Sequence, residues 1–141
     1  MNENLRAQLI RDEGSVPHAY QDSLGYWTIG VGRLIDQRKG GKLSEAEIAF
    51  LLDNDIARHA NELFAAIPWA RDLDPVRQGV LINMAFNLGV PGLLKFANTL
   101  AAIKARDYDD AAVRMLQSRW ADQVGLRAVR LAKQMRTGEW Q

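Results

Sequence analysis

The spacing of apolar residues in this chain of 141 residues switches from that of strands to that of helices close to residue 44. Before that point, strand-forming residues between Tyr20 and Val31 are interrupted by glycines, and the stretch from Asp22 to Gly25 has the composition of a turn. After it, apolar residues recur at the three-and-four spacing of amphipathic helices. A short helix that starts near Leu5 is expected to end near Gly14, since Pro17 bars its continuation. This helix, the small sheet and the run of helices predict an α+β fold in two lobes, and such a shape favours a cleft between the sheet and the helical body.

A chain of this length normally folds around one core, so a single domain over residues 1–141 is expected. The predicted divisions are a small lobe at residues 14–43 with its sheet at 19–34, a helical lobe at residues 1–13 and 60–141, and a long connecting helix at residues 44–67.

Capping residues set the predicted helix ends. Ser44 and Glu47 form a capping box at the start of the long helix. Asp74 followed by Pro75 starts the next helix, and Gly89 ends it. Shorter helices are expected at 91–96, 99–106, 108–118 and 125–135. Four apolar residues of the long helix are expected in the core: Ile48, Leu51, Leu52 and Ile56.

The sequence lacks the residues that several classes of chemistry require. It has no cysteine, which excludes disulfides, zinc–thiolate sites and thiol nucleophiles, and two histidines are too few for a histidine-rich metal centre. It contains neither a Gly-x-Ser-x-Gly motif nor a glycine-rich phosphate loop. We therefore expect no metal and no cofactor.

Basic residues concentrate in the second half of the chain. Residues 71–141 carry 11 basic and 7 acidic side chains, a balance of +4, and six of these cations share the stretch 114–136 with Asp122 as its one acid. Two interpretations stay open: a surface that attracts an anionic polymer or membrane, and an ordinary solvated helix face. The N-terminus lacks the basic-then-apolar order of a secretory signal, and no apolar run approaches the roughly 20 residues of a membrane span.

Carboxylates offer the remaining route to catalysis. Glu13 is expected at the end of the first helix, Asp22 in the turn of the sheet and Thr28 on a strand. A glycosidase needs one carboxyl group that donates a proton to the leaving oxygen and a second that stays ionised, about 6.5–9.5 Å apart in inverting enzymes to admit a water. The Thr28 hydroxyl is a suitable ligand for that water. Spacing alone does not single out these residues, since the chain has 17 acidic side chains.

Three short motifs near the N-terminus are more specific. They are Arg11-Asp12-Glu13-Gly14, Ala19-Tyr20-Gln21-Asp22-Ser23 and Gly25-Tyr26-Trp27-Thr28-Ile29-Gly30-Val31-Gly32. In this order they resemble the phage-type lysozymes, the endolysins related to the lysozyme of phage T4. The resemblance continues through Phe86-Asn87-Leu88-Gly89, Phe96-Ala97-Asn98-Thr99-Leu100 and Arg136-Thr137-Gly138-Glu139-Trp140, so it covers essentially the whole chain.

The resemblance implies a lysozyme-like fold and hydrolysis of the β-1,4 bond between N-acetylmuramic acid and N-acetylglucosamine in bacterial peptidoglycan. It implies that Glu13 is the general acid, Asp22 the second catalytic group and Thr28 the water-positioning partner of an inverting enzyme. The residues that it implies at the substrate cleft are Leu34, Phe86, Asn87, Thr99 and Arg114. We expect a monomer that binds no nucleic acid and does not insert stably into membranes. Lacking a signal peptide, it is expected in the host cytoplasm on synthesis and at the cell wall after release.

Three features depart from the family pattern. Arg33 stands where the family often has histidine, which puts a pH-dependent ion pair in doubt but not catalysis. The stretch from Leu34 to Ser44 is shorter than in the best-known member, so one cleft wall is expected to be trimmed. Arg114 occupies a position where that member has a polar residue that contacts the substrate.

Three other functions stay open at this point. A lytic transglycosylase also cuts peptidoglycan, but it needs one acid and releases an anhydro-sugar, so Asp22 argues against it. A wall-binding module without catalysis has no need of Glu13, Asp22 and Thr28 together. The basic segment 114–136 could permeabilise membranes, although its apolar residues are those that a core requires.

Overall fold

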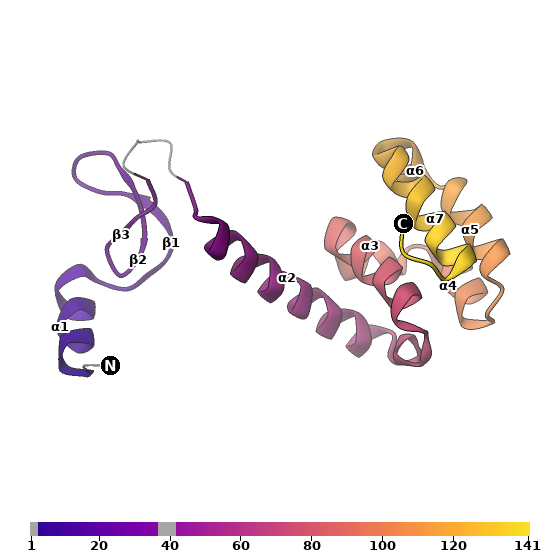
Figure 1. Ribbon diagram of the computed structural model, residues 1–141, viewed down its shortest axis with the longest axis horizontal. Helices are drawn as coiled ribbons and strands as arrows, with labels where there is room; N and C mark the ends of the chain where they lie inside the picture. Colours follow the sequence, from indigo (N-terminus) through magenta and orange to yellow (C-terminus); the bar gives the residue numbers. More distant parts are fainter. Residues whose placement is uncertain (1–2, 37–41) are drawn as a thin grey trace. The chain divides into compact units, whose positions relative to one another are not determined.

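A computed structural model of the chain describes residues 3–36 and 42–141, without the side chain of Leu5. It contains two compact units, Met1–Leu51 and Leu52–Gln141. The predicted assignment of residues 1–13 to the helical lobe stays a prediction, and part of the stretch from Leu34 to Ser44, where a trimmed cleft wall is expected, lies outside the described residues. The described parts combine a small antiparallel sheet with a run of helices, which confirms the predicted α+β class (Figure 1).

The first unit consists of one helix, three short strands and the beginning of a long helix. These elements are α1 (Glu3–Glu13), β1 (Val16–Gln21), β2 (Trp27–Gly30), β3 (Arg33–Leu34) and the first part of α2 (Glu45–Ala66). Gly14 ends α1, because its positive φ of 80° turns the chain while its amide still donates to the Ile10 carbonyl at 2.9 Å. The strands are antiparallel in the order β1-β2-β3.

The first strand begins three residues earlier than the predicted sheet. β1 starts at Val16 and includes Pro17, which was expected to bar the continuation of the first helix and not to belong to the sheet. A proline is tolerated here because β1 is an edge strand and its register with β2 shifts between Val16 and Tyr20.

The second unit is helical. After the remainder of α2 it contains η1 (Pro68–Asp72), α3 (Pro75–Leu94), α4 (Ala97–Lys104), α5 (Tyr108–Leu116), α6 (Arg119–Val124) and α7 (Leu126–Thr137). The predicted stop at Gly89 is a sharp kink in α3, where that residue has φ 72° and ψ 157°. Helix α6 was not predicted; the Ser118 side chain caps it by accepting from the Ala121 amide at 3.2 Å. No single described helix combines the length and apolar content of a membrane span, although α3 and α4 taken together across a 105° bend do.

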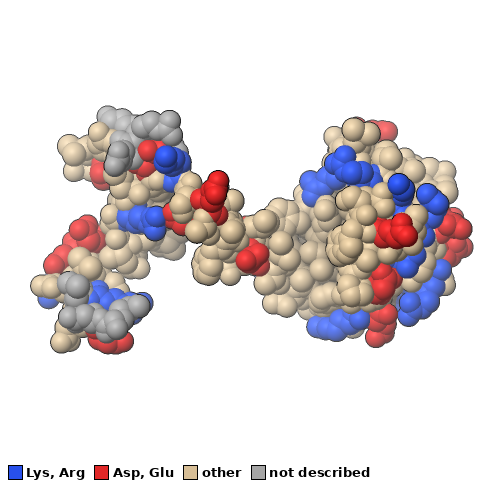
Figure 2. Space-filling view, viewed as in Figure 1, with Lys and Arg blue, Asp and Glu red and all other residues tan. Residues whose placement is uncertain are grey.

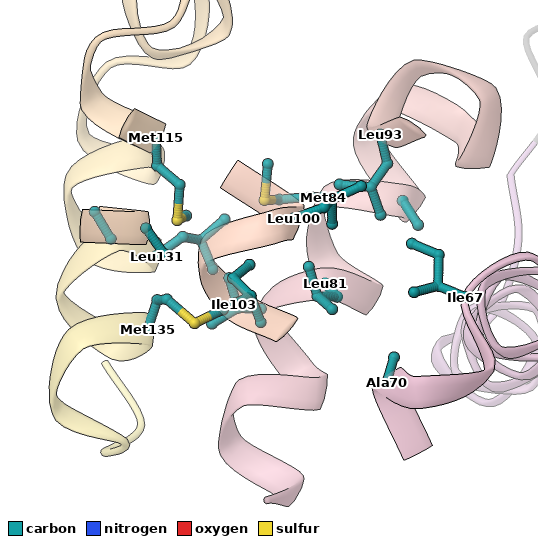
Figure 3. Close-up of a cluster of buried hydrophobic side chains, with 14 of the residues drawn as sticks. Ile67, Ala70, Leu81, Met84, Leu93, Leu100, Ile103, Met115, Leu131 and Met135 are labelled. Carbon is teal, nitrogen blue, oxygen red and sulfur yellow. The ribbon is translucent and has the colours of Figure 1, made fainter. Parts of the chain in front are cut away.

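Side chains from the helices α2 to α7 and from the η1 region form the core of the second unit, part of which Figure 3 shows. The labelled members are Ile67 and Ala70 around η1, Leu81, Met84 and Leu93 on α3, Leu100 and Ile103 on α4, Met115 on α5, and Leu131 and Met135 on α7. Helix α5 packs against both α4 and α7, so the last four helices hold one another in place.

Helix α2 contributes less to this core than its apolar stripe suggested. Leu63 is fully buried, but Ile48, Leu51, Leu52 and Ile56 are between 41% and 54% exposed, so their predicted core position is wrong. Three of them line hollows instead: Leu51 in the first unit, Leu52 and Ile56 in the second. A helical period shows which face is apolar, but not what covers it.

A partly buried arginine joins the start of α3 to the end of α7. The Arg77 guanidinium donates to the carbonyls of Met135 (2.7 Å) and Arg136 (3.2 Å) and to the Asp74 carboxylate (3.0 Å), and it lies 3.7 Å from the Tyr108 ring centroid. It thereby satisfies carbonyls that the end of α7 leaves free. Asp74 in turn accepts from the Arg77 amide as the N-cap of α3, which confirms the predicted cap.

Burial is the largest single influence on the pKa of Asp74 and raises it, but the backbone and side-chain hydrogen bonds and the charge of Arg77 together outweigh it. The result is a pKa below the ordinary value of 3.8. We therefore predict that Asp74→Asn lowers the free energy of unfolding by about 0.3–1 kcal/mol at neutral pH. The difference from wild type should vanish as the pH falls through the depressed pKa of Asp74, because a carboxyl with a lowered folded pKa stabilises only while it is ionised.

Urea unfolding at neutral and at strongly acid pH measures this difference. Asp107→Asn is the matched control, since Asp107 also caps a helix but has no arginine partner among the described residues. A loss for Asp74→Asn that persists unchanged in acid would show that side-chain geometry, not charge, is responsible.

Candidate functional site

One carboxylate organises the turn between β1 and β2. Oδ1 of Asp22 accepts from the amides of Leu24 (2.9 Å) and Tyr26 (2.8 Å), and the Asp22 amide donates to the Tyr26 carbonyl at 2.9 Å. The Asp22 carbonyl accepts from Gly25 at 3.0 Å, and the positive φ of 83° at Gly25 suits the tight reversal. The turn predicted at 22–25 is confirmed, and one oxygen of the Asp22 carboxylate is used in hydrogen bonds to the backbone.

The same backbone unit also holds Thr28. Its side-chain hydroxyl donates to the Tyr26 carbonyl at 3.1 Å, the carbonyl that accepts from the Asp22 amide. Because its proton is used in this hydrogen bond, the Thr28 hydroxyl oxygen can act toward a further partner only as an acceptor. Thr28 is 5% exposed and pairs with Tyr20 on β1 and Leu34 on β3.

Glu13 is the last residue of α1, and its exposed side chain lies against Gly32. A Cβ atom at position 32 would lie 2.5 Å from Oε2 of Glu13 and 2.8 Å from its Cδ, so the carboxyl group occupies the space that glycine leaves empty. Gly32 has a φ of 61° and lies in the loop between β2 and β3. Glu13, Asp22 and Thr28 therefore all belong to the first unit, two of them on the sheet and its turn.

Arg33 has a partner that the sequence did not indicate. Its guanidinium contacts Oε1 of Glu47 at 2.7 Å, which joins β3 to the first turn of α2. Glu47 also accepts from the Ser44 amide at 3.1 Å, while the Ser44 hydroxyl accepts from the Glu47 amide at 3.2 Å, as the predicted capping box requires. Because an arginine stays charged across the accessible pH range, the cation of this pair does not titrate.

Leu34, the one predicted cleft residue of the first unit, is exposed beside Thr28. It borders a hollow of about 630 Å³ that Arg33, Asp36, Ser44 and Glu47 also line. An exposed leucine at the edge of a polar hollow offers one apolar surface among hydrogen-bonding groups, a combination that suits a sugar ring.

In the second unit, two predicted substrate residues share a hollow. Thr99, at the start of α4, and Arg114, in the last turn of α5, line a space of about 250 Å³ together with Asn98 and Gln117. Arg114 is held by Asp110, with 2.7 Å between Nε and Oδ2. Asn98 and Gln117 add amide groups to this hollow, and neither carries a sequence motif that predicts this place.

The other two predicted substrate residues have protein partners. Phe86 lines a separate apolar groove of about 470 Å³ with Leu52, Ile56, Ile82, Trp140 and others, and its ring centroid lies 5.0 Å from that of His59. Oδ1 of Asn87 accepts from the indole of Trp120 at 2.8 Å. The apolar groove has no carboxylate in its lining, so its size does not make it the place of an acid–base reaction.

No group of three His, Asp or Glu side chains converges as a metal site within residues 3–36 and 42–141.

Comparisons with known proteins agree with these features. The family model described as phage lysozyme matches residues 11–137. Two proteins of Dictyostelium discoideum, named "Probable T4-type lysozyme 1" and "Probable T4-type lysozyme 2", are 29% and 27% identical, and each alignment covers 98% of this chain and 96% of the relative. The "Pre-baseplate central spike protein Gp5" of Enterobacteria phage T4 is 29% identical over 97% of this chain, which corresponds to 28% of that protein.

Hydrogen bonds from Ser44, first those of its side chain and then that of its backbone amide, lower the pKa of Glu47 from its ordinary value of 4.5; burial opposes them, and the charge of Arg33 contributes less. We predict that Ser44→Ala raises the pKa of Glu47 toward 4.5 and that Arg33→Ala raises it by a smaller amount. Carbon-13 NMR titration of the glutamate carboxyl groups measures both shifts. A larger shift in Arg33→Ala would contradict this order of causes.

Proposed function

Because this chain belongs to the phage lysozyme family, we propose that it is a muramidase that hydrolyses the β-1,4 bond between N-acetylmuramic acid and N-acetylglucosamine in bacterial peptidoglycan. Membership of the family makes it a glycosidase of the lysozyme type. The observation that carries the finer proposal is the shared anchoring of Asp22 and Thr28 on the backbone of Tyr26. This anchoring fixes the position of the Asp22 carboxylate relative to the Thr28 hydroxyl, as two groups that bind and orient one water require.

Glu13 is the proposed general acid. It donates its proton to the glycosidic oxygen as the bond from C1 of the muramic acid residue breaks, so the leaving sugar departs as a neutral alcohol. The Glu13 side chain is exposed in the free protein. A sugar chain lying over it removes water, and loss of water favours the neutral form that an acid needs.

Asp22 and Thr28 are the proposed partners of the attacking water. The water donates one hydrogen bond to the Thr28 oxygen, whose own proton is held by the Tyr26 carbonyl. As its oxygen bonds to C1 from the face opposite the leaving group, the water gives a proton to Asp22. Attack from the opposite face inverts C1, so a β-linked substrate yields an α-configured product. Asp22 also stabilises the positive charge that develops on the sugar ring.

Substrate contacts are proposed for the other predicted residues that border hollows. Leu34 offers an apolar surface beside Thr28, and Thr99 and Arg114 offer polar groups in the second unit. Asn87 is proposed to act by holding the Trp120 indole in place, because its carboxamide oxygen already accepts the hydrogen bond of that indole.

The proposed biological role is that of an endolysin. The enzyme is made as a monomer in the cytoplasm of a bacterial host and acts on the cell wall after release. The motifs from Arg11 to Gly32 support this role, because they are those of the phage-type enzymes.

Membrane permeabilisation by the basic segment 114–136 is less well supported. The apolar residues of α7 that a membrane-binding helix would use are buried in the second unit: Ala128, Leu131, Ala132 and Met135. Leu126 and Val129 alone among the large apolar residues of α7 are exposed, which is too narrow a face for interfacial binding.

The cations of α6 and α7 instead suit attraction to an anionic wall. Figure 2 shows patches of Lys and Arg over the second unit. Arg119, Arg130, Lys133 and Arg136 have no acidic partner within the part of the chain that the structure describes. Peptidoglycan with free peptide carboxylates is a polymer of opposite charge, so long-range attraction raises the encounter rate.

We predict that binding to isolated cell walls weakens as salt rises, because salt screens attraction beyond roughly 10 Å at 0.1 M. A sedimentation assay with Glu13→Gln, which binds without degrading the walls, measures this. The double variant Arg130→Gln/Lys133→Gln should bind less at low salt and lose most of the salt dependence. Binding that is indifferent to salt would remove the electrostatic role.

The central prediction concerns the two carboxylates. Glu13→Gln should lower the rate of turbidity loss of purified peptidoglycan by about 10²- to 10⁴-fold, since it removes the acid, and Asp22→Asn should lower it by a similar order. Glu3→Gln, at the other end of α1, is the control and should retain full activity. Thermal unfolding of each variant shows whether the fold is kept. Lysis by Glu13→Gln at the wild-type rate would overturn the proposed function.

A further inference from the structure

We propose that Gly32 is a positioning residue for the catalytic acid. Because glycine has no side chain, the carboxyl group of Glu13 occupies the space that a Cβ atom would fill at position 32. The inference rests on the proposed role of Glu13. It assigns a function to one glycine of the Gly30-Val31-Gly32 loop and none to the other.

The contact is specific to the end of the Glu13 side chain. The three atoms nearest to a Cβ at position 32 are Oε2, Cδ and Cγ of Glu13, at 2.5, 2.8 and 3.0 Å. Distances under about 3 Å are below van der Waals contact for carbon and oxygen, so any residue other than glycine forces a displacement. The positive φ of 61° adds a backbone reason for glycine at this position.

Gly30 separates these two reasons. Its φ of 67° matches that of Gly32, yet a Cβ at position 30 would meet nothing within 4 Å. A side chain at position 30 is therefore destabilising only because of the left-handed backbone. A side chain at position 32 is destabilising for the same reason and in addition collides with Glu13.

The glutamate, not the loop, yields to an added side chain. Arg33 follows Gly32 directly and is fixed twice, by pairing with Ile29 in the sheet and by its ion pair with Glu47. The Glu13 carboxyl is the free end of a flexible, exposed side chain and rotates away at small cost. Gly32→Ala should thus be about as stable as Gly30→Ala but hold its acid in the wrong place.

A misplaced acid lowers catalysis more than binding. Displacement of a catalytic group by about 1 Å can cost on the order of 10²-fold in rate. The sugar chain is held by contacts elsewhere, so KM should change little. The predicted signature of Gly32→Ala is a kcat at least about tenfold below that of Gly30→Ala, with KM within about threefold.

The experiment compares wild type, Gly30→Ala, Gly32→Ala and Glu13→Gln. Thermal unfolding measures the cost of the backbone, kcat and KM on soluble peptidoglycan fragments measure catalysis, and carbon-13 NMR of labelled glutamate follows the Glu13 carboxyl. Glu13→Gln assigns that signal by its disappearance. We expect similar unfolding temperatures for the two alanine variants, and a shifted Glu13 signal together with a low kcat for Gly32→Ala alone.

Two results overturn the proposal: a Glu13 signal that is unchanged in Gly32→Ala, or equal kcat values for the two alanine variants. Full activity of Glu13→Gln is a different failure. It overturns the proposed function of Glu13 and with it the catalytic part of this inference, while the NMR signal still decides whether Gly32 seats the carboxyl.

Discussion

The two hydrogen bonds between Asp22 and the backbone of Tyr26, one to the Asp22 carboxylate and one from the Asp22 amide, determine much of the small unit. They close the turn that sets β2 against β1, and this pairing buries Thr28 between Tyr20 and Leu34. The next two glycines along the chain then turn it back into β3. A side chain that the sequence presents as an ordinary turn aspartate is thus both the support of the sheet and the proposed base. Its two oxygens divide these tasks, since Oδ1 takes both backbone amides.

This double use limits how the site can vary. Replacement of Asp22 by alanine removes the acceptor for two amides as well as the base, so lost activity alone does not separate folding from chemistry. Asparagine keeps an oxygen in place of Oδ1 and is the more informative substitution. Glu13 differs, because its side chain has no hydrogen-bond partner within the described residues and lies against Gly32.

Local signals in the sequence were reliable where one or two residues determine the structure. The turn at Asp22, the capping box of Ser44 and Glu47, and the kink at Gly89 all depend on neighbours within a few residues. Features that depend on distant partners could not be predicted. The burial of the α2 stripe, the partner of Arg33 and the seat of Glu13 at Gly32 each require two segments to be placed against one another. Helix α6 was missed because six residues are too few to show a period.

The configuration of the first product tests the two-carboxylate account most directly. Proton NMR of soluble peptidoglycan fragments, recorded at once after addition of enzyme, resolves the anomers of the new reducing end before they equilibrate. The account predicts that the α-anomer of N-acetylmuramic acid appears first and that the β-anomer follows only by mutarotation. A β-anomer formed first, or a 1,6-anhydro product with no reducing end, would contradict attack by a water held between Asp22 and Thr28.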